Sequence, residues 1–191
     1  DNIIKNYIKK KNFLNQHNRS YYDKDSPIIS DKKYDDLKKE TLELEKSSSV
    51  LKKYGSKFII GTSVRLAGFK RVNRLITIFS HYVKENPNAL LVIVGDGIER
   101  YNLEKQVSEL DIKGDTIFEG YQEEVATYQA VFDVCIFTSL NEPFGLVAVE
   151  CYSKKKPVLI FSDGGGITEI VRRFESKDIC LDSNEIINRL N

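Results

Sequence analysis

The chain has 191 residues, of which 41% are hydrophobic and 30% are charged, and its formal net charge is +1. This composition is typical of a globular protein with room for one ordinary domain and a smaller piece. A net charge so close to zero provides no overall basic field, which argues against general affinity for nucleic acid or an anionic membrane. No apolar run approaches the ~18 residues of a membrane-spanning helix, and no signal-peptide core is present.

The cysteines and histidines predict neither disulfides nor a metal site. Cys135, Cys151 and Cys180 are odd in number and lie in apolar segments, which is typical of reduced core thiols in a cytoplasmic protein. His17 and His81 have no partner at metal-ligand spacing, so we expect surface histidines and no tightly bound metal. The sequence also contains no methionine and begins at Asp1, from which we expect a fragment or a trimmed chain.

The first segment predicts two helices. Apolar residues recur at helical spacing over 2–22, and a turn follows at 23–27, where Pro27 disfavours helical backbone for the preceding residue. Ser30 or Asp31 is a suitable N-cap for a second helix. Both helices have thin apolar stripes, so we expect them to need a partner surface.

The same segment resembles the N-terminal Ia domain of bacterial NAD-dependent DNA ligases. The resemblance rests on the pair of tyrosines before a turn and on the pattern SPIISDKKYD at 26–35. In that family the corresponding positions bind the nicotinamide mononucleotide (NMN) half of NAD, so the resemblance implies this role for Tyr21, Tyr22, Asp31, Tyr34 and Asp35. Aromatic faces suit stacking on nicotinamide, and carboxylates suit ribose hydroxyls or the pyridinium charge. No K-x-D-G motif, which ligase chemistry needs, occurs in the sequence.

A serine run with lysines and a glycine, KSSSVLKKYGS at 46–56, is typical of a short linker. We place the domain boundary near Ser49. The expected organisation is a ligase-like helical segment with its linker over 1–49 and a second domain over 50–191.

Beyond the linker, strand and helix patterns alternate. Continuous apolar runs such as 89–94 are typical of strands buried on both faces of a parallel sheet. Strands are expected at 58–65, 89–94, 116–118, 134–137, 158–161 and 179–181. Helices are expected at 72–83, 98–110, 122–131, 146–153, 166–173 and 184–190. This alternation predicts an α/β fold with a doubly wound, Rossmann-like parallel sheet, preceded by the small helical segment.

Polar and glycine residues follow most of these strands. Arg65, Gly95, Thr138, Glu142 and Gly165 each come just after an expected strand. Because ligands bind at the carboxyl ends of the strands in such sheets, we expect these residues on one functional rim. The alternative is that the charged residues are simply solvated in loops and that the glycines serve only tight turns.

The stretch 142–150, EPFGLVAVE, combines a turn with the start of a helix. Pro143 and Gly145 favour a bend from which the helix departs, leaving the backbone N–H groups of residues 144–146 pointing outward. Such a helix end binds anions, phosphate above all. Glu142 lies outside the helix, and Glu150 lies about two turns inside it.

This stretch resembles the E-x7-E signature of retaining, nucleotide-sugar-dependent glycosyltransferases of family 4, in the C-terminal donor-binding half of their GT-B fold. The segment SVRLAGFKRVNRLI at 63–76 resembles the family's first strand and loop, and further motifs follow in the family's order. The resemblance covers about residues 50–191. One departure is Lys155, where the family has a glycine, so we expect local strain at that helix end.

The resemblance implies transfer of a sugar from a nucleoside diphosphate sugar with retention of configuration. Arg65 and Lys70 would contact the diphosphate, together with the amides of Phe144, Gly145 and Leu146, and Glu142 would face the reacting hexose. Donor binding would also involve Glu150 at the ribose, Tyr121 near the base, and Gly165 and Gly166 through their backbone. The donor is a substrate, and no tightly bound cofactor is expected.

A GT-B enzyme also needs an acceptor domain of comparable size, for which the first 49 residues are too few. We therefore expect an incomplete glycosyltransferase, and turnover by this chain stays open, as do the base, the sugar and the acceptor. One alternative is a DNA-ligase fragment that binds NMN, the only reading that implicates nucleic acid. Another is an α/β scaffold that binds neither ligand.

Overall fold

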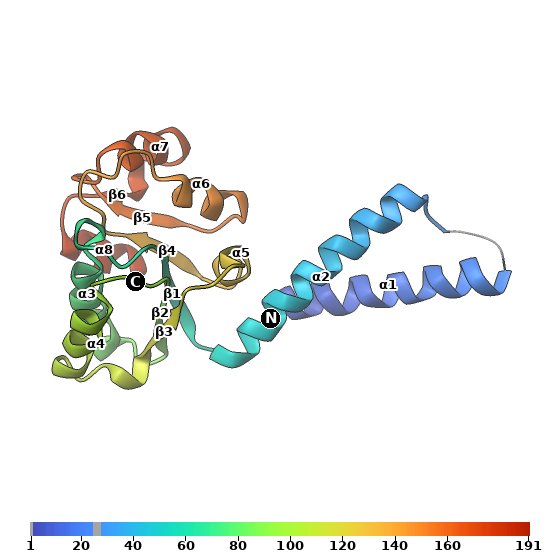
Figure 1. The fold of residues 1–191 in the computed structure, drawn as a ribbon, viewed down its shortest axis with the longest axis horizontal. Helices are drawn as coiled ribbons and strands as arrows, with labels where there is room; N and C mark the ends of the chain where they lie inside the picture. Colours follow the sequence, from blue (N-terminus) through green and yellow to red (C-terminus); the bar gives the residue numbers. More distant parts are fainter. Residues whose placement is uncertain (1, 25–27) are drawn as a thin grey trace. The chain divides into compact units, whose positions relative to one another are not determined.

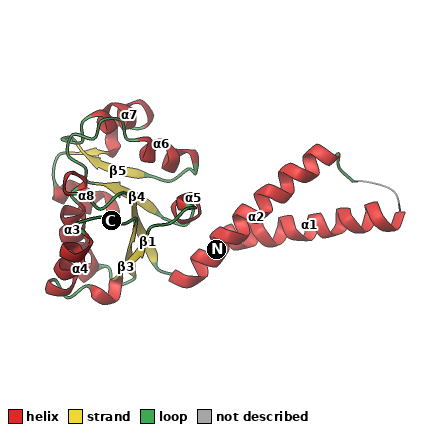
Figure 2. Ribbon diagram, in the orientation of Figure 1, coloured by secondary structure: helices red, strands yellow, loops and turns green. Residues whose placement is uncertain are grey.

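A computed structural model describes residues 2–24 and 28–191 of the chain. The chain separates into two compact units, Asp1–Gly55 and Ser56–Asn191. Figure 1 traces both units along the sequence, and Figure 2 distinguishes their helices and strands. In the described part no helix is long and apolar enough to cross a membrane.

The first unit is a hairpin of two helices, α1 (Asn2–Lys24) and α2 (Asp31–Tyr54). Contacts between the two run in opposite chain directions, which makes the pair antiparallel. They are the Tyr7 hydroxyl to the Glu45 carboxylate, 2.8 Å, the Lys10–Glu40 ion pair, and the His17 and Tyr34 rings, 5.0 Å between centroids.

Two expectations for this unit are wrong. His17 is buried rather than exposed, because its ring contacts Tyr34 and its Nδ1 accepts a hydrogen bond from the Ile28 N–H, 3.2 Å. The stretch 46–54, expected as linker, continues helix α2. Leu, Glu and Lys flank the serine run, and extending an existing helix costs far less than starting one. The chain therefore divides after Gly55.

The second unit is built on six parallel strands in the order β3-β2-β1-β4-β5-β6. The strands are β1 (Phe58–Ser63), β2 (Ala89–Val94), β3 (Thr116–Gly120), β4 (Val134–Phe137), β5 (Val158–Phe161) and β6 (Ile179–Cys180). The strand order reverses between β1 and β4, which defines the switch point of a doubly wound fold and confirms the predicted fold class.

Helices cover both faces of this sheet. They are α3 (Val72–Glu85), α4 (Arg100–Glu109), α5 (Val125–Gln129), α6 (Leu146–Ser153), α7 (Gly166–Phe174) and α8 (Ser183–Leu190), with short 3-10 turns η1 (Gly68–Lys70), η2 (Lys113–Asp115) and η3 (Ser176–Asp178). Figure 1 shows α3, α4 and α8 on one side of the sheet and α5 and α6 on the other. Helix α5 is shorter than the 122–131 expected.

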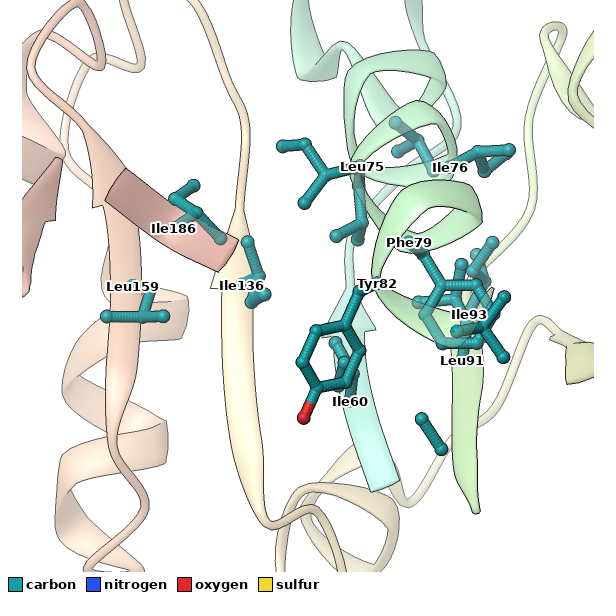
Figure 3. Close-up of a cluster of buried hydrophobic side chains, with 14 of the residues drawn as sticks. Ile60, Leu75, Ile76, Phe79, Tyr82, Leu91, Ile93, Ile136, Leu159 and Ile186 are labelled. Carbon is teal, nitrogen blue, oxygen red and sulfur yellow. The ribbon is translucent and has the colours of Figure 1, made fainter. Parts of the chain in front are cut away.

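The core of the sheet unit is apolar and continuous. Helix α3 places Leu75, Ile76 and Phe79 on the strands, where each is 1% exposed or less. Figure 3 shows these side chains in one cluster with Ile93 and Ile136 of the sheet. Strand β2 is buried along its whole length, as its apolar run predicts. The loops at the carboxyl ends of the strands are therefore attached to a well-packed, rigid sheet.

Candidate functional site

The predicted site residues of the sheet unit follow four strands that end on the same rim. Arg65 and Lys70 follow β1, Tyr121 follows β3, Glu142 follows β4, and the glycines 164–166 follow β5. Since the strands are all parallel, these loops share the carboxyl edge on both sides of the switch point. The edge location is thus common to all of them, but their contacts differ.

Lys70 and Glu142 form an ion pair across the switch point. Their side chains are 13% and 14% exposed, and Lys70 Nζ donates to Glu142 Oε2. Lys70 Nζ also lies 5.1 Å from the centre of the Phe69 ring. A cation and a carboxylate that are 72 residues apart in sequence are thus held together in a partly desolvated place, where charge interactions are stronger than in water.

The backbone around Glu142 is tied to the glycine loop after β5. The Glu142 N–H donates to the Gly164 carbonyl, 2.7 Å, and the Gly166 N–H donates to the Glu142 carbonyl, 2.7 Å. A Cβ on Gly166 would lie 2.1 Å from the Pro143 carbonyl oxygen, and Gly165 has φ 75°. Only glycine permits this close approach of the two loops.

Helix α6 begins at Leu146, directly after a glycine. Gly145 has φ 84° and is its N-cap. Within the described part of the chain, the backbone N–H groups of Phe144, Gly145 and Leu146 donate no hydrogen bond. Unpaired amides at a helix start carry partial positive charge and bind anions. Phe144 and Leu146 side chains beside them are 58% and 62% exposed.

Thr138 holds the loop that carries Lys70. Its hydroxyl lies 3.0 Å from the Lys70 carbonyl oxygen and 2.8 Å from that of Arg71. Arg71 has φ 49° and pairs with Asp163 at 3.4 Å. The loops after β1, β4 and β5 are therefore joined through side chains as well as backbone.

Glu150 lies on α6 and is exposed, but one of its carboxylate oxygens accepts a hydrogen bond from Gln129. Gln129, at the end of α5, is 1% exposed, and its Nε2 lies 3.0 Å from Glu150 Oε2 and 3.1 Å from Ser63 Oγ. Gln129 is a residue that sequence reasoning missed. Its segment is polar, and only the tertiary contact with Glu150 distinguishes it.

The residue after Glu150 belongs to the core. The Cys151 thiol is fully buried, and its interaction with Cys135, together with burial, raises the pKa of the Cys135 thiol well above its usual value. Cys180 is buried as well. All three cysteines are free and buried, as predicted.

Arg65 and Tyr121 also lie on the rim, but their side chains are exposed. Arg65 is exposed, and Tyr121 is 76% exposed. Neither side chain hydrogen-bonds or forms an ion pair within residues 28–191 or the described part of α1. The structure thus brings Lys70, Glu142 and the glycine loop together and leaves these two facing solvent.

A cavity of about 350 Å³ lies between η1, the start of α3 and α4. Its wall mixes amide and charged side chains with three apolar ones. The lining residues are Ala67, Gly68, Arg71, Val72, Asn73, Glu99, Asn102, Leu103 and Gln106. None of the predicted donor-binding residues contributes to it.

In the hairpin, the ligase-like residues cluster at the start of α2. Asp31 and Asp35 are exposed one turn apart, which places them on the same helix face. Tyr34 is half-buried against His17. Tyr21 and Tyr22 belong to α1, but their side chains lie outside the described part.

The fold, a Rossmann-like domain with six parallel strands, matches the C-terminal half of GT-B enzymes. A family model described as glycosyl transferases group 1 matches residues 43–189. The chain therefore belongs to the group 1 glycosyltransferases. A second model, the DNA ligase-like N-terminal NAD+-binding domain, matches residues 2–56.

Individual relatives agree with both matches. N-acetyl-alpha-D-glucosaminyl L-malate synthase of Bacillus anthracis is 29% identical over 131 residues, 68% of this chain and 34% of that protein. The DNA ligase of Petrotoga mobilis is 42% identical over 79 residues, 41% of this chain and 12% of the ligase. The chain spans at most about a third of these relatives.

Among solved structures, Anabaena Alr3699/HepE in complex with UDP has a TM-score of 0.68 and 26% sequence identity. The match covers 77% of this chain and 42% of that one. The similarity is thus confined to a part of the larger protein, as it is for the curated relatives.

Proposed function

We propose that the sheet unit binds UDP-sugar as the donor half of a retaining glycosyltransferase. The observation that carries this proposal is the Lys70–Glu142 ion pair, partly desolvated at the switch point beside the unpaired amides that start α6. The choice of uridine is supported by UDP in the complex of the 26% identical HepE protein. The proposal extends the family membership to particular residues.

The diphosphate is assigned to the positive groups of the rim. Lys70, Arg65 and the amides of residues 144–146 offset the negative charge that grows on the leaving diphosphate. Before the donor binds, Glu142 neutralises Lys70. A diphosphate that shares Lys70 releases the Glu142 carboxylate to accept hydrogen bonds from hexose hydroxyls near the reacting carbon.

The nucleoside is assigned to the neighbouring groups. Glu150 accepts hydrogen bonds from the ribose hydroxyls, and Tyr121 lies beside the base. Gly165 and Gly166 have no side chain, so the donor can approach their backbone closely. Charge-assisted hydrogen bonds contribute ~1.5–3 kcal/mol each, but association itself costs several kcal/mol. We therefore expect a dissociation constant between micromolar and millimolar.

These 191 residues are proposed to bind donor and to transfer sugar poorly by themselves. In N-acetyl-alpha-D-glucosaminyl L-malate synthase of Bacillus anthracis, about two thirds of the protein lie outside the part that this chain matches. Measurable turnover by the purified chain, with any nucleotide sugar and acceptor, would contradict this.

The test is an NMR titration of the chain with UDP, GDP and NMN in turn. We expect UDP to shift the resonances of Lys70, residues 144–150 and Gly165. Lys70→Ala should weaken UDP binding about 10- to 100-fold, the equivalent of one charge-assisted contact. Lys10→Ala, which also removes one lysine from an ion pair but in the hairpin, is the matched control and should leave UDP affinity unchanged. A Lys70→Ala protein that binds UDP like the wild type would refute the assignment.

NMN binding by the hairpin is the second candidate function. The family-model match to residues 2–56 favours it, together with two exposed carboxylates one turn apart on α2, Asp31 and Asp35. Shifts confined to Tyr34, Asp31 and Asp35 on adding NMN, and lost in Asp35→Ala, would support this candidate. In that case a nucleic-acid context becomes relevant for the hairpin, whereas no shift with NMN would remove it.

A further inference from the structure

Gln129 occupies a position that joins both sides of the switch point. It lies at the end of α5, between the last residue of β1, Ser63, and the carboxylate of Glu150 on α6. A carboxylate only accepts hydrogen bonds, so the Gln129 amide nitrogen faces Glu150. Ser63 is buried and anchors the same nitrogen from the sheet.

The stability of the fold does not explain why this residue is a glutamine. Its Oε1 is buried and has no hydrogen-bond partner in the part of the chain that the structure describes. A buried polar atom without a partner is destabilising, and an apolar side chain of similar size would avoid that cost. What the amide provides is its nitrogen, which contacts Ser63 Oγ inside the fold and the Glu150 carboxylate at the rim.

Glu150 needs such a contact. It stands on an exposed helix surface, and among the described residues only Gln129 hydrogen-bonds to its carboxylate. A glutamate on a helix surface otherwise samples several rotamers, and ordering it for a ligand costs conformational entropy. Gln129 holds Oε2, which leaves Oε1 of the same carboxylate available.

We infer that Gln129 is a positioning residue for the nucleotide: it fixes the Glu150 carboxylate so that the free oxygen accepts a ribose hydroxyl. This inference rests on the proposed assignment of Glu150 to the ribose. Gln129 does not touch the donor. It acts through Glu150, and its effect exists only for nucleotides that carry ribose hydroxyls.

The test is a set of dissociation constants for UDP and for 2′,3′-dideoxyuridine diphosphate with the full chain. The proteins are wild type, Gln129→Leu, Glu150→Ala and the double variant. We expect Gln129→Leu to weaken UDP binding about tenfold, the equivalent of one lost hydrogen bond. Its affinity for the dideoxynucleotide should equal that of the wild type. In the Glu150→Ala protein, adding Gln129→Leu should have no further effect.

Ser63→Ala is the second variant, which loosens Gln129 from the sheet but keeps its amide. It should give a smaller loss of the same selective kind, and it serves if Gln129→Leu fails to fold. Gln129→Leu or Ser63→Ala binding UDP like the wild type, or weakening both nucleotides equally, would overturn the inference while the proposed function stands. A Glu150→Ala chain that binds UDP unchanged would overturn the inference together with the ribose assignment on which it rests, and a wild-type chain that binds no UDP would overturn the proposed function as well.

Discussion

The two units of this chain differ most in what they bury. The sheet unit has large apolar side chains with almost no exposure, such as Phe79, Phe132 and Phe161. In the hairpin, the described side chains that are buried are mainly polar: His17, Thr41, Ser47 and Ser48, with Tyr54. The hairpin helices meet through ion pairs, hydrogen bonds and a ring contact. The sheet unit has an extensive apolar core, and among the described side chains of the hairpin Tyr54 is the one buried hydrophobic residue.

This difference bears on where precise chemistry can be located. Catalytic and binding groups must be held close to one geometry by packed neighbours. The rim loops of the sheet unit are hydrogen-bonded to one another and lie next to a packed core, whereas the ligase-like carboxylates of α2, Asp31 and Asp35, are exposed. The contrast therefore supports donor binding in the sheet unit as the main activity.

The largest expected effect is that of a core truncation in the sheet unit, compared with truncation of a half-exposed leucine in the hairpin. Phe79→Ala should lower the free energy of unfolding of the sheet unit by about 3–5 kcal/mol, because it leaves a cavity in a packed core. Leu42→Ala in α2, where the side chain is 52% exposed, should change the stability of the hairpin by less than about 0.5 kcal/mol. Urea titration followed by resolved NMR resonances of each unit measures both. Equal losses in the two units would break the comparison.

Alkaline pH should destabilise the sheet unit through its buried thiols, because all three cysteines lie in it. Burial raises the pKa of the Cys180 thiol from 9.0 to about 11. Between these values the unfolded chain releases the proton and the folded chain keeps it, so stability present below pH 9 is lost as pH rises towards 11. One pKa unit corresponds to about 1.4 kcal/mol, so the expected loss is roughly 2–3 kcal/mol.

The measurement is the free energy of unfolding at pH 8.5, 9.5, 10.5 and 11.5, for wild type and Cys180→Ala. The variant should lose less stability over this range, whatever its stability at pH 8.5. Parallel curves for the two proteins would show that the Cys180 thiol does not contribute.

The smallest expected effect concerns backbone strain at one residue of the sheet unit. Lys155 follows α6 with φ 58°, where a side chain is strained and glycine is not. Lys155→Gly should therefore stabilise the unit by about 0.5–1 kcal/mol, which corresponds to a melting temperature higher by a few degrees. Lys154→Gly, at φ −94°, is the control and should be neutral or destabilising. A lower melting temperature for Lys155→Gly would refute the strain.

Periodicity and composition predicted much of the sheet unit. Strand 89–94 and helix 146–153 have the expected bounds, because a long apolar run and a turn with Pro143 and Gly145 are strong local signals. The left-handed backbone at Lys155 also agrees with the strain expected there. The resemblance, rather than periodicity, selected the rim residues and their proposed roles.

Two of the misses, Gln129 and His17, have their physical origin in contacts between distant segments. Gln129 gains its position from Ser63 and Glu150, which no local pattern connects. His17 is buried through Ile28 and Tyr34. The serine run continues α2 because Ser47 and Ser48 are buried and strong helix formers flank them. Local propensity is a weak guide wherever tertiary contacts decide.

The two edge strands of the sheet make this unit suitable for fusion to different neighbouring domains. Strand β6, at one edge, is only two residues long, and β3, at the other, pairs with β2 through a register shift between Ile93 and Val94. A short or irregular edge offers few consecutive backbone groups to a foreign strand, which discourages sheet-to-sheet aggregation. A domain with such edges can be joined to new neighbours during evolution without recruiting them into its sheet.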